Sequence, residues 1–167
     1  MRKAKLMSAL LSFAMVVTTV FSSAGIQATT AKAMTGTGTS AADPYTISSY
    51  ADLAQMSTLV QKAIGDVYFK LTANINASGE TYQTPSNGSA RVHLDGNNKT
   101  ISNLTSFERA GFASVSGKSR ICYGLFGHVA TLEATDLTLS KCALEDTEQH
   151  SAVYAGILAG RINTTSA

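Results

Sequence analysis

Apolar and polar positions follow three different patterns along the chain, and the first pattern predicts a segment that is removed. Residues 6–21 are apolar except for Ser and Thr, follow the basic start MRKAK, and precede a stretch of mostly small residues at 22–33. This order predicts a signal peptide over 1–33, with cleavage after Ala33 in the pattern Ala31-Lys32-Ala33. The alternative is a membrane anchor, but the apolar run has 16 residues, fewer than the roughly 20 that a spanning helix needs.

The second pattern is helical. Apolar residues at three- and four-residue steps predict one amphipathic helix over about 50–64, formed by Leu53, Met56, Leu59, Val60, Ala63 and Ile64. Ser49 and Asp52 have capping-box spacing at its start, and Gly65 is a stop signal at its end. Residues 34–43, rich in Gly, Thr, Ser and Ala, predict a flexible linker, and 44–66 an N-terminal strand followed by this capping helix.

The third pattern predicts β-structure from residue 67 to 167. Short runs of Val, Ile, Thr and aromatic residues alternate there with Asn, Gly and Ser. A shift of 33 residues aligns 100–106 with 133–139 and 122–129 with 155–162 without a gap. Ankyrin repeats share this period but need two helical patterns per unit, so strand-like units favour a β-solenoid. Its inward positions are predicted to be Ile101, Leu104, Leu125, Leu137, Leu139 and Leu158.

Charge changes the picture once the signal peptide is set aside. Four of the 13 basic residues and none of the 11 acids lie in 1–33, so the remaining chain has 9 basic and 11 acidic residues and a formal charge of −2. This balance excludes a clustered basic surface of the kind that binds nucleic acid. Cleavage would also leave a protein that is not integral to a membrane.

Five segments in a fixed order carry a resemblance to a known family. They are ADPYTISSYADLAQM (42–56), YFKLTANINAS (68–78), HLDGNNKTISNL (93–104), YGLFGHV (123–129) and YAGILAGRI (154–162). Over residues 39–162 the chain resembles the N-terminal part of bacterial surface proteins with GLUG repeats, named for a Gly-x-Leu-x-Gly core. Gly156, Leu158 and Gly160 match that core fully, whereas the earlier copy has Tyr123 in place of the first glycine and continues with Gly124, Leu125 and Gly127.

The resemblance implies architecture and location rather than catalysis. Such repeat regions resemble the pectin-lyase-like fold. We therefore expect a mainly β protein, a right-handed parallel β-helix with one N-terminal capping helix and an incomplete last coil, secreted or held at the cell surface. The family offers no catalytic residues to transfer to this stretch.

Metal and glycan sites are the first chemistry to weigh, in HLDGNNKTISNLTSF (93–107). Asp95, Asn97 and Lys99 begin like a calcium loop, but Lys99, Thr100 and Ser106 stand where an EF-hand needs a ligand, a glycine and a glutamate. A calcium site of another kind on Asp95 and a tight Asp95-Gly96 turn with positive φ remain as alternatives. The glycosylation sequons at Asn76, Asn87, Asn98, Asn103 and Asn163 are equally explained by asparagines at solenoid corners.

Other chemistry-bearing residues give no catalytic constellation, so we predict no catalytic, cofactor-binding or metal-binding residues and no cofactor. His93, His128 and His150 lack ligand spacing, and the acids Glu145, Asp146 and Glu148 are interpreted as a solvated loop. Cys122 and Cys142 either form a disulfide, which secretion permits, or are two small packing residues. Tyr82 and Phe107 are the better surface aromatics for binding a sugar.

These observations predict a non-enzymatic, adhesin-type module that binds host or matrix glycans or proteins. The alternative is the N-terminal, non-catalytic region of a secreted carbohydrate-active enzyme or metallopeptidase whose active site lies beyond residue 167. More repeats and a wall anchor in the sequence beyond that residue would favour the first, and a zinc-peptidase motif or a clustered Asp/Arg groove the second.

Overall fold

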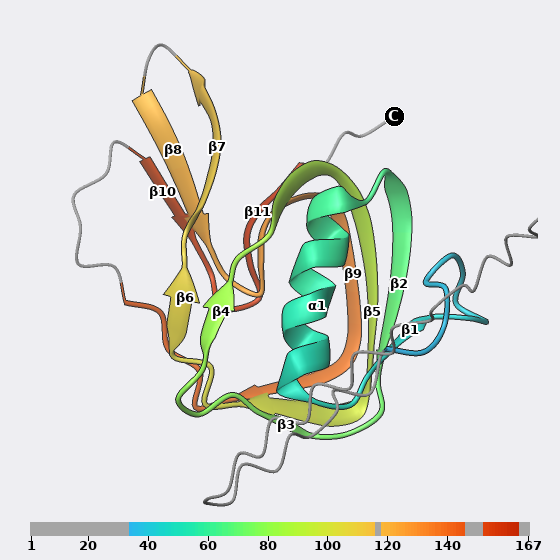
Figure 1. Ribbon diagram of the computed structural model, residues 1–167. Helices are drawn as coiled ribbons and strands as arrows, with labels where there is room; N and C mark the ends of the chain where they lie inside the picture. The colour runs from blue at the N-terminus through green and yellow to red at the C-terminus, as the bar shows by residue number, and fades with distance from the viewer. Residues whose placement is uncertain (1–33, 116–117, 146–151, 164–167) are drawn as a thin grey trace, which may run out of the picture. The chain divides into compact units, whose positions relative to one another are not determined.

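The computed structural model describes residues 34–115, 118–145 and 152–163, and they form a mainly β structure with one helix (Figure 1). The predicted signal peptide and its cleavage at Ala33 lie outside these residues. In chain order the elements are β1 Tyr45–Ile47, α1 Tyr50–Lys62, β2 Gly65–Leu71, β3 Ile75–Asn76, β4 Thr81–Gln83, β5 Ser86–Ser102, β6 Ser106–Glu108, β7 Ala110–Val115, β8 Lys118–Tyr123, β9 Phe126–Ser140, β10 Ala152–Ala155 and β11 Ala159–Ile162.

The main sheet is parallel throughout, with the strand order β1-β2-β5-β9-β11 and β3 also paired to β5. Parallel neighbours need a long connection between them, and here the chain returns to each new neighbour through the other strands. A second sheet pairs β4 with β6, also in parallel, and a third has the order β10-β8-β7. Only the β7–β8 hairpin is antiparallel among the described pairs of strands.

The spacing between paired residues changes along the stack of strands. Lys70 pairs with Asp95, 25 residues on, whereas His93 pairs with Glu133, 40 residues on. The extra residues in the second case include the β7–β8 hairpin. Phe126 pairs with Ala159, a separation of 33 residues, whereas Tyr123 pairs with Ala155, a separation of 32. The 33-residue shift is therefore confirmed for 126–129, and 122–123 are displaced from it by one residue.

The same shift is wrong for the block at 100–106. Thr100 pairs with Thr138 and Ile101 with Leu139, a separation of 38 residues. Residues 107–125, between the paired strands β5 and β9, carry the β7–β8 hairpin, which lengthens this return of the chain. A single gapless shift cannot describe turns of unequal length.

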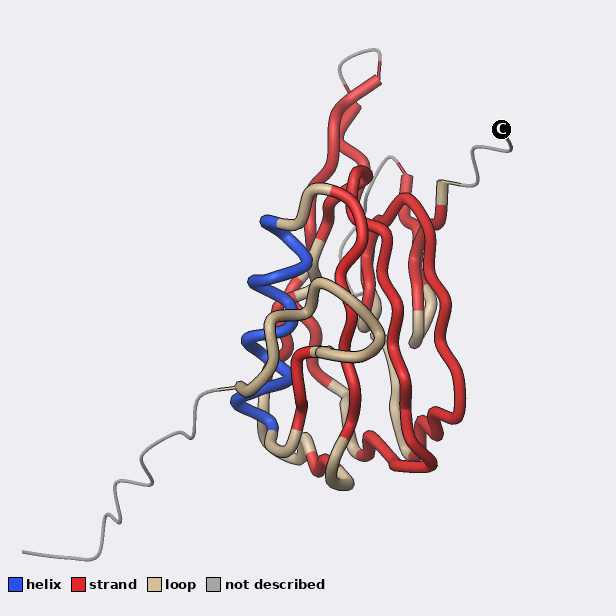
Figure 2. Tube along the Cα trace, turned by 90° about the vertical axis from the view of Figure 1, so that its right-hand side faces the viewer, coloured by secondary structure: helices blue, strands red, loops and turns tan. Residues whose placement is uncertain are grey.

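Helix α1 lies against one side of the strands (Figure 2) and contacts β5, β1 and β4. It buries Leu53, Met56 and Val60 completely against the core. The helix is where the sequence predicts it, and Ser49 caps it by accepting a hydrogen bond from the Asp52 backbone N–H at 3.2 Å. The Asp52 carboxylate accepts from the backbone and side chain of Ser48, rather than from Ser49 as a standard capping box would have it.

A side chain from the sheet caps the other end of the helix. The Asn87 amide nitrogen, on β5, donates to the carbonyl oxygens of Val60 at 2.9 Å and Ala63 at 2.7 Å. The Val60 carbonyl also accepts from the Ala63 N–H at 3.2 Å, so the amide is a second donor to Val60 and a donor to the Ala63 carbonyl at the end of the helix. Asn87 therefore joins the helix to the strands, a role that its sequon did not predict.

The residues predicted to point inward all belong to the core. Ile101, Leu104 and Leu125 are fully buried, and Leu137, Leu139 and Leu158 pack against the same cluster while remaining partly exposed. Leu137 and Leu139 lie on the part of β9 that pairs with β5 on one side and has no described strand on the other. Burial of the apolar columns is thus more complete near the helix than at β9.

Asparagines form the corners of the main sheet. Asn97, Asn98 and Asn103 all have positive φ, which asparagine tolerates better than most residues. Asp136 and Lys141 also have positive φ. Asp136 lies one residue before Leu137, the partner of Lys99, and Lys141 lies one residue after Ser140, the partner of Ser102. Of the five sequon asparagines, Asn98 and Asn103 therefore lie at corners with positive φ. The turn predicted at Asp95-Gly96 takes its positive φ from Asn97 and Asn98 and not from Gly96.

Gly96 is required for a different reason. A Cβ atom at Gly96 would lie 2.5 Å from the Asp136 carbonyl oxygen and 2.5 Å from Leu137 Cα. The glycine therefore lets β5 and β9 approach each other at this corner.

Residues 34–43 differ from the linker that their composition predicts. The Thr35 backbone carbonyl accepts from the Thr46 N–H at 2.9 Å, and the Gly38 carbonyl accepts from the Tyr68 N–H at 2.9 Å. Asp43 accepts from the Thr37 backbone and hydroxyl, which closes the loop on itself. The segment thus lies hydrogen-bonded along β1 and β2, because its glycines and short polar side chains form turns rather than a free tether.

Candidate functional site

Two rows of outward-facing side chains cross the main sheet. One row is Tyr68, His93 and Glu133, and the other is Lys70, Asp95 and Thr135. Each row takes one residue from β2, one from β5 and one from β9, because parallel strands in register bring equivalent positions side by side. The rows are two residues apart along each strand, and inward-facing Phe69 and Leu94 lie between them.

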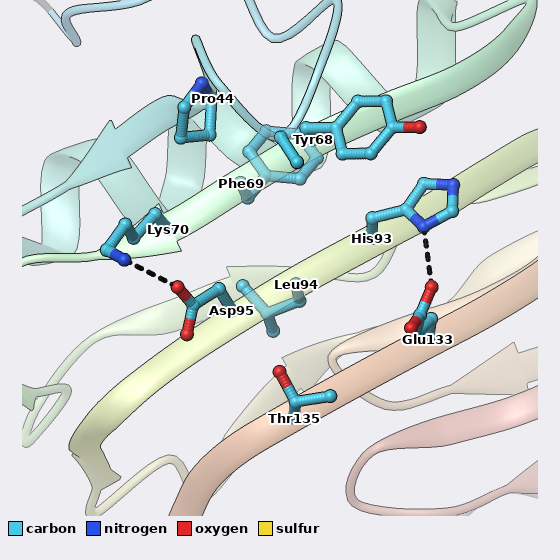
Figure 3. A pocket seen from close by; sticks show the side chains of 10 residues that line it. Pro44, Tyr68, Phe69, Lys70, His93, Leu94, Asp95, Glu133 and Thr135 are labelled. Carbon is cyan, nitrogen blue, oxygen red and sulfur yellow. Dashed lines mark hydrogen bonds and ion pairs between the residues drawn. The ribbon is translucent and has the colours of Figure 1, made fainter.

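A hollow of about 180 Å³ lies between these rows, and we call it the trough. Pro44 and Ala41 also line it, beside β2. Figure 3 shows the Lys70–Asp95 and His93–Glu133 pairs on either side of Phe69 and Leu94, with Thr135 below Leu94 and Pro44 above Phe69. The trough therefore runs across the strands, in the direction in which they stack.

The imidazole of His93 joins both outer strands to β5. Its Nδ1 lies 2.9 Å from Glu133 Oε2, and its Nε2 lies 3.0 Å from Asp66 Oδ1. Tyr68 stacks on it with ring centroids 4.3 Å apart and planes inclined by 8°. Ionised carboxylates only accept hydrogen bonds, so His93 satisfies both contacts when both of its nitrogens are protonated.

The charged neighbours of His93 raise its pKa. Burial favours the neutral ring, but the hydrogen bonds from His93 to Asp66 and Glu133 and the charges of these carboxylates outweigh burial, so the pKa lies above its usual value. Asp66 also accepts from Nε and Nη2 of the Arg91 guanidinium, with one carboxylate oxygen for each nitrogen. Hydrogen bonds from Arg91 first, and then from His93, lower the pKa of the Asp66 carboxyl far below its usual range.

The second row is also fixed by an ion pair. Lys70 Nζ lies 2.6 Å from Asp95 Oδ2, and Asp95 Oδ1 accepts from the Asn97 backbone N–H at 2.7 Å. The hydrogen bond from Lys70 is the main cause that lowers the pKa of Asp95, and the Asn97 N–H adds to it. Asp95 is therefore a structural anion at the corner as well as part of the trough wall.

The trough does not form a metal centre in this geometry. Asp66 and Glu133 contact opposite nitrogens of the same ring, so a single ion could not touch both carboxylates and the imidazole. Over the part of the chain that the structure describes, no group of three or more His, Cys, Asp or Glu side chains is placed to hold a metal ion. Asp95, the residue considered for calcium, is bound by Lys70 instead.

The repeat-motif glycines lie against one another. A Cβ at Gly124 would come within 2.2 Å of the Gly156 carbonyl oxygen, and one at Gly160 within 2.8 Å of the Gly127 carbonyl oxygen. The backbone N–H of Leu125 donates to the Ile157 carbonyl oxygen at 2.9 Å. Tyr123, at the position of the missing glycine, is buried and pairs with Ala155. The two copies therefore stack directly, and their glycines permit close contact between the backbones.

The cysteines do not form a bridge in this structure. Both thiols are free, and their neighbours differ: Cys122 Sγ lies 3.5 Å from the Ala110 carbonyl oxygen, and Cys142 Sγ lies 3.7 Å from that of Ile101. Burial raises the pKa of the Cys122 thiol. Their placement corresponds to the alternative of two packing residues.

Tyr82 is not a surface aromatic. It is fully buried, its hydroxyl donates to the Leu125 carbonyl oxygen at 3.1 Å, and Phe107 packs edge-on against it while half-buried. A tyrosine can enter a core where its hydroxyl finds a partner. The prediction of a surface sugar-binding pair is therefore wrong for Tyr82.

Other predicted candidates contribute nothing to the trough. Glu145 is exposed, whereas Asp146, Glu148 and His150 lie outside the described residues. His128 pairs with Arg161 on the neighbouring strand β11. Sequon residues Asn76 and Asn103 bond to each other, with Asn103 Nδ2 2.8 Å from Asn76 Oδ1.

The sequence does contain a pattern that indicates the trough, but at a separation of 25 residues and not of 33. At a separation of 25 residues, Asp66 matches Arg91 and Lys70 matches Asp95, two pairs of opposite charge. Tyr68 matches His93 at the same separation. Opposite charges recurring at one spacing indicate cross-strand partners, whereas Glu133 could not be found this way because its separation from His93 is 40 residues.

Comparisons with protein-family models, curated proteins and solved structures give no match to the chain. Among the described residues, α1 is too short and too polar to cross a membrane.

Proposed function

We propose that the protein is a non-enzymatic binding module, secreted or held at the cell surface, whose parallel strands form a right-handed β-helix capped by α1. It attaches to host or matrix polymers through the trough. The stacked glycines of the two Gly-x-Leu-x-Gly copies support the resemblance to GLUG-repeat surface proteins. The parallel main sheet, with its regular return of the chain, supports the β-helix.

One observation carries the binding role. The trough walls come from strands β2, β5 and β9, and ion pairs hold their side chains to one another before any ligand arrives. A recognition surface that is already ordered loses less conformational entropy when it binds. The trough crosses three strands, which presents side chains from β2, β5 and β9 to successive units of a polymer.

The charges of the trough favour binding over acid–base catalysis. A carboxylic acid that donates a proton in a reaction needs a raised pKa, but hydrogen bonds from Arg91 and Lys70 lower those of Asp66 and Asp95. Both nitrogens of His93 are occupied by carboxylates. These groups therefore hold each other in place rather than standing ready to transfer a proton.

A binding assay with a blocked trough tests this function. The purified protein is passed over immobilised mucin, collagen, peptidoglycan and a neutral plant glucan, and surface plasmon resonance records binding. Thr135→Trp places an indole in the trough wall, whereas Thr138→Trp changes an equally exposed residue of the same strand beyond the corner at Asp136.

We expect binding to at least one polymer, a loss of tenfold or more in affinity with Thr135→Trp, and no change with Thr138→Trp. No binding to any of the four polymers, or equal binding by both variants, would contradict the proposed function.

A further inference from the structure

On two of the three strands of the trough, a ligand can contact side chains but not the backbone, because the backbone is already paired. The strand β5 pairs with β2 on one side and β9 on the other along the trough, and β2 is paired with β5 and, through Tyr68 and Phe69, with the segments at Gly38 and Tyr45. Extended peptides are typically recognised by adding a strand to a free sheet edge. A chain that lies across the strands cannot do so, which favours a polymer recognised through its own side groups.

The charges that line the trough balance. Asp95 faces Lys70, and Glu133 faces the imidazole of His93. With His93 protonated, these two anions and two cations sum to zero, and with His93 neutral the sum is −1. A polyanion would have to compete with Asp95 and Glu133 for cations that are already paired, at the cost of uncompensated charge.

The polar groups of the trough match hydroxyl groups. Carboxylate oxygens have lone pairs beyond the one used in an ion pair, and the Lys70 ammonium has three donors, of which Asp95 takes one. Glu133 is the more exposed of the two acids that line the trough, with 69% of its side chain accessible against 40% for Asp95. The ring of Tyr68 and that of Pro44 supply apolar surface beside these groups, a combination typical of small-ligand recognition sites.

We infer that the trough binds a linear, uncharged polysaccharide, which lies along the stacking direction across β2, β5 and β9. This inference rests on the proposed function and names its ligand class. Hydroxyl groups of successive sugar units donate to Asp95 and Glu133 and accept from Lys70, and the apolar faces of the sugars pack on Tyr68 and Pro44. The sugar units of the ligand follow one another in the direction in which the strands stack, and neighbouring strands are about 4.8 Å apart.

Matched pairs of sugars test the inference. Isothermal titration calorimetry at pH 6 compares cellohexaose with carboxymethylated cellohexaose, and fully methyl-esterified hexagalacturonate with the free acid. In each pair the backbone is the same and only the charge differs. We expect the uncharged member of at least one pair to bind ten times more tightly than its anionic counterpart, and Thr135→Trp to abolish that binding.

A charge variant makes the test sharper. Asp95→Asn with Glu133→Gln removes two anions from the trough. The affinity of this double variant for the uncharged sugars should fall tenfold or more, and its affinity for the anionic members should rise. Glu80→Gln with Glu145→Gln removes the same charge from exposed positions outside the trough lining and should change neither. If the double trough variant does not fold, as judged by circular dichroism, the matched pairs on the unaltered protein decide alone.

The outcomes separate the two proposals. Tighter binding of the anionic members, or binding only to collagen, with loss in Thr135→Trp in either case, would overturn the uncharged polysaccharide and leave the proposed function standing. Absence of binding to every sugar and every immobilised polymer would overturn both.

Discussion

His93 and Glu133 lie 40 residues apart in the chain, yet Nδ1 of His93 is 2.9 Å from Oε2 of Glu133. Parallel pairing of β5 with β9 places the two residues side by side, and pairing of β5 with β2 brings Asp66 to the other nitrogen of the same ring. The imidazole therefore connects three strands through charge, on a face where Tyr68 covers one of its sides.

This arrangement predicts that stability depends on pH near neutrality. The folded pKa of His93 is raised above its ordinary value of 6.5, so its contribution to stability is fully present below pH 6.5 and is lost as the pH rises through the folded pKa. The groups that contact the ring are Asp66 and Tyr68 from β2 and Glu133 from β9, and Arg91 from β5 pairs with Asp66.

Urea unfolding between pH 5.5 and 9 at constant salt measures the effect, since this range extends from about 1 unit below a typical histidine pKa to about 2.5 units above it. We expect the free energy of unfolding to fall with rising pH, and His93→Gln to flatten the curve across this window. An unchanged slope in His93→Gln would show that another group titrates. Asp66 and Asp95 affect stability in a separate, acidic pH range. Because their pKa values are lowered in the folded protein, their contribution to stability is lost only as the pH falls below the ordinary aspartate value of 3.8.

Leu104 tests the inward register. It is fully buried beside the corner at Asn103, and Leu104→Ala should lower the free energy of unfolding by about 2–5 kcal/mol through lost burial and the cavity left behind. Leu104→Asp should prevent folding, because a carboxylate would be placed in the core without a partner. An unchanged β-type circular dichroism spectrum and melting curve for Leu104→Asp would disprove the register.

Asn87 tests the attachment of the helix. Asn87→Ala removes the donor to the carbonyls of Val60 and Ala63 and should cost about 1–3 kcal/mol, the usual range for leaving partly buried polar groups without a partner. Asn87→Asp keeps the shape but replaces the donor with an anion facing two carbonyl oxygens, so it should be the more destabilising of the two. Urea midpoints for the two variants rank them, and the opposite order would contradict the cap.

Gly124 tests the stacking of the repeat motifs. Its φ is +138°, and a Cβ would lie 2.2 Å from the Gly156 carbonyl oxygen, so Gly124→Ala should lower the melting temperature markedly. Gly111→Ala is the matched control, since nothing lies within 4 Å of its Cβ position. Equal melting temperatures for the two alanine variants would mean that the motifs do not pack as described.

The sequence predicts the local elements of this fold well and their long-range partners only in part. The helix with its Ser49 cap, the asparagine corners and the inward leucines follow from residue preferences and periodicity, which act over a few residues. Pairing partners depend on the length of each return of the chain. The separation is 25 residues between Lys70 and Asp95 and 40 between His93 and Glu133, because the second return carries the β7–β8 hairpin.

The candidate site was missed for the same reason. His93 has no recognisable ligand spacing in the sequence, and its partners Asp66 and Glu133 come from strands before and after it. Tyr82 fails in the opposite direction: its turn-rich surroundings suggest exposure, but its side chain points inward from β4 and its hydroxyl is satisfied by Leu125. Neither result can be obtained from neighbouring residues alone.

The most direct measurement of the central claim is a map of where an uncharged sugar binds. Backbone amide resonances of the ¹⁵N-labelled protein are followed during titration with cellohexaose or the methyl-esterified hexagalacturonate. The account predicts that the shifts gather on the trough residues Tyr68, Lys70, His93, Asp95 and Thr135, and that Glu80 and Gln55 on exposed positions elsewhere stay unchanged. Shifts confined to the edge of β9 beyond Asp136, or spread over α1, would contradict it.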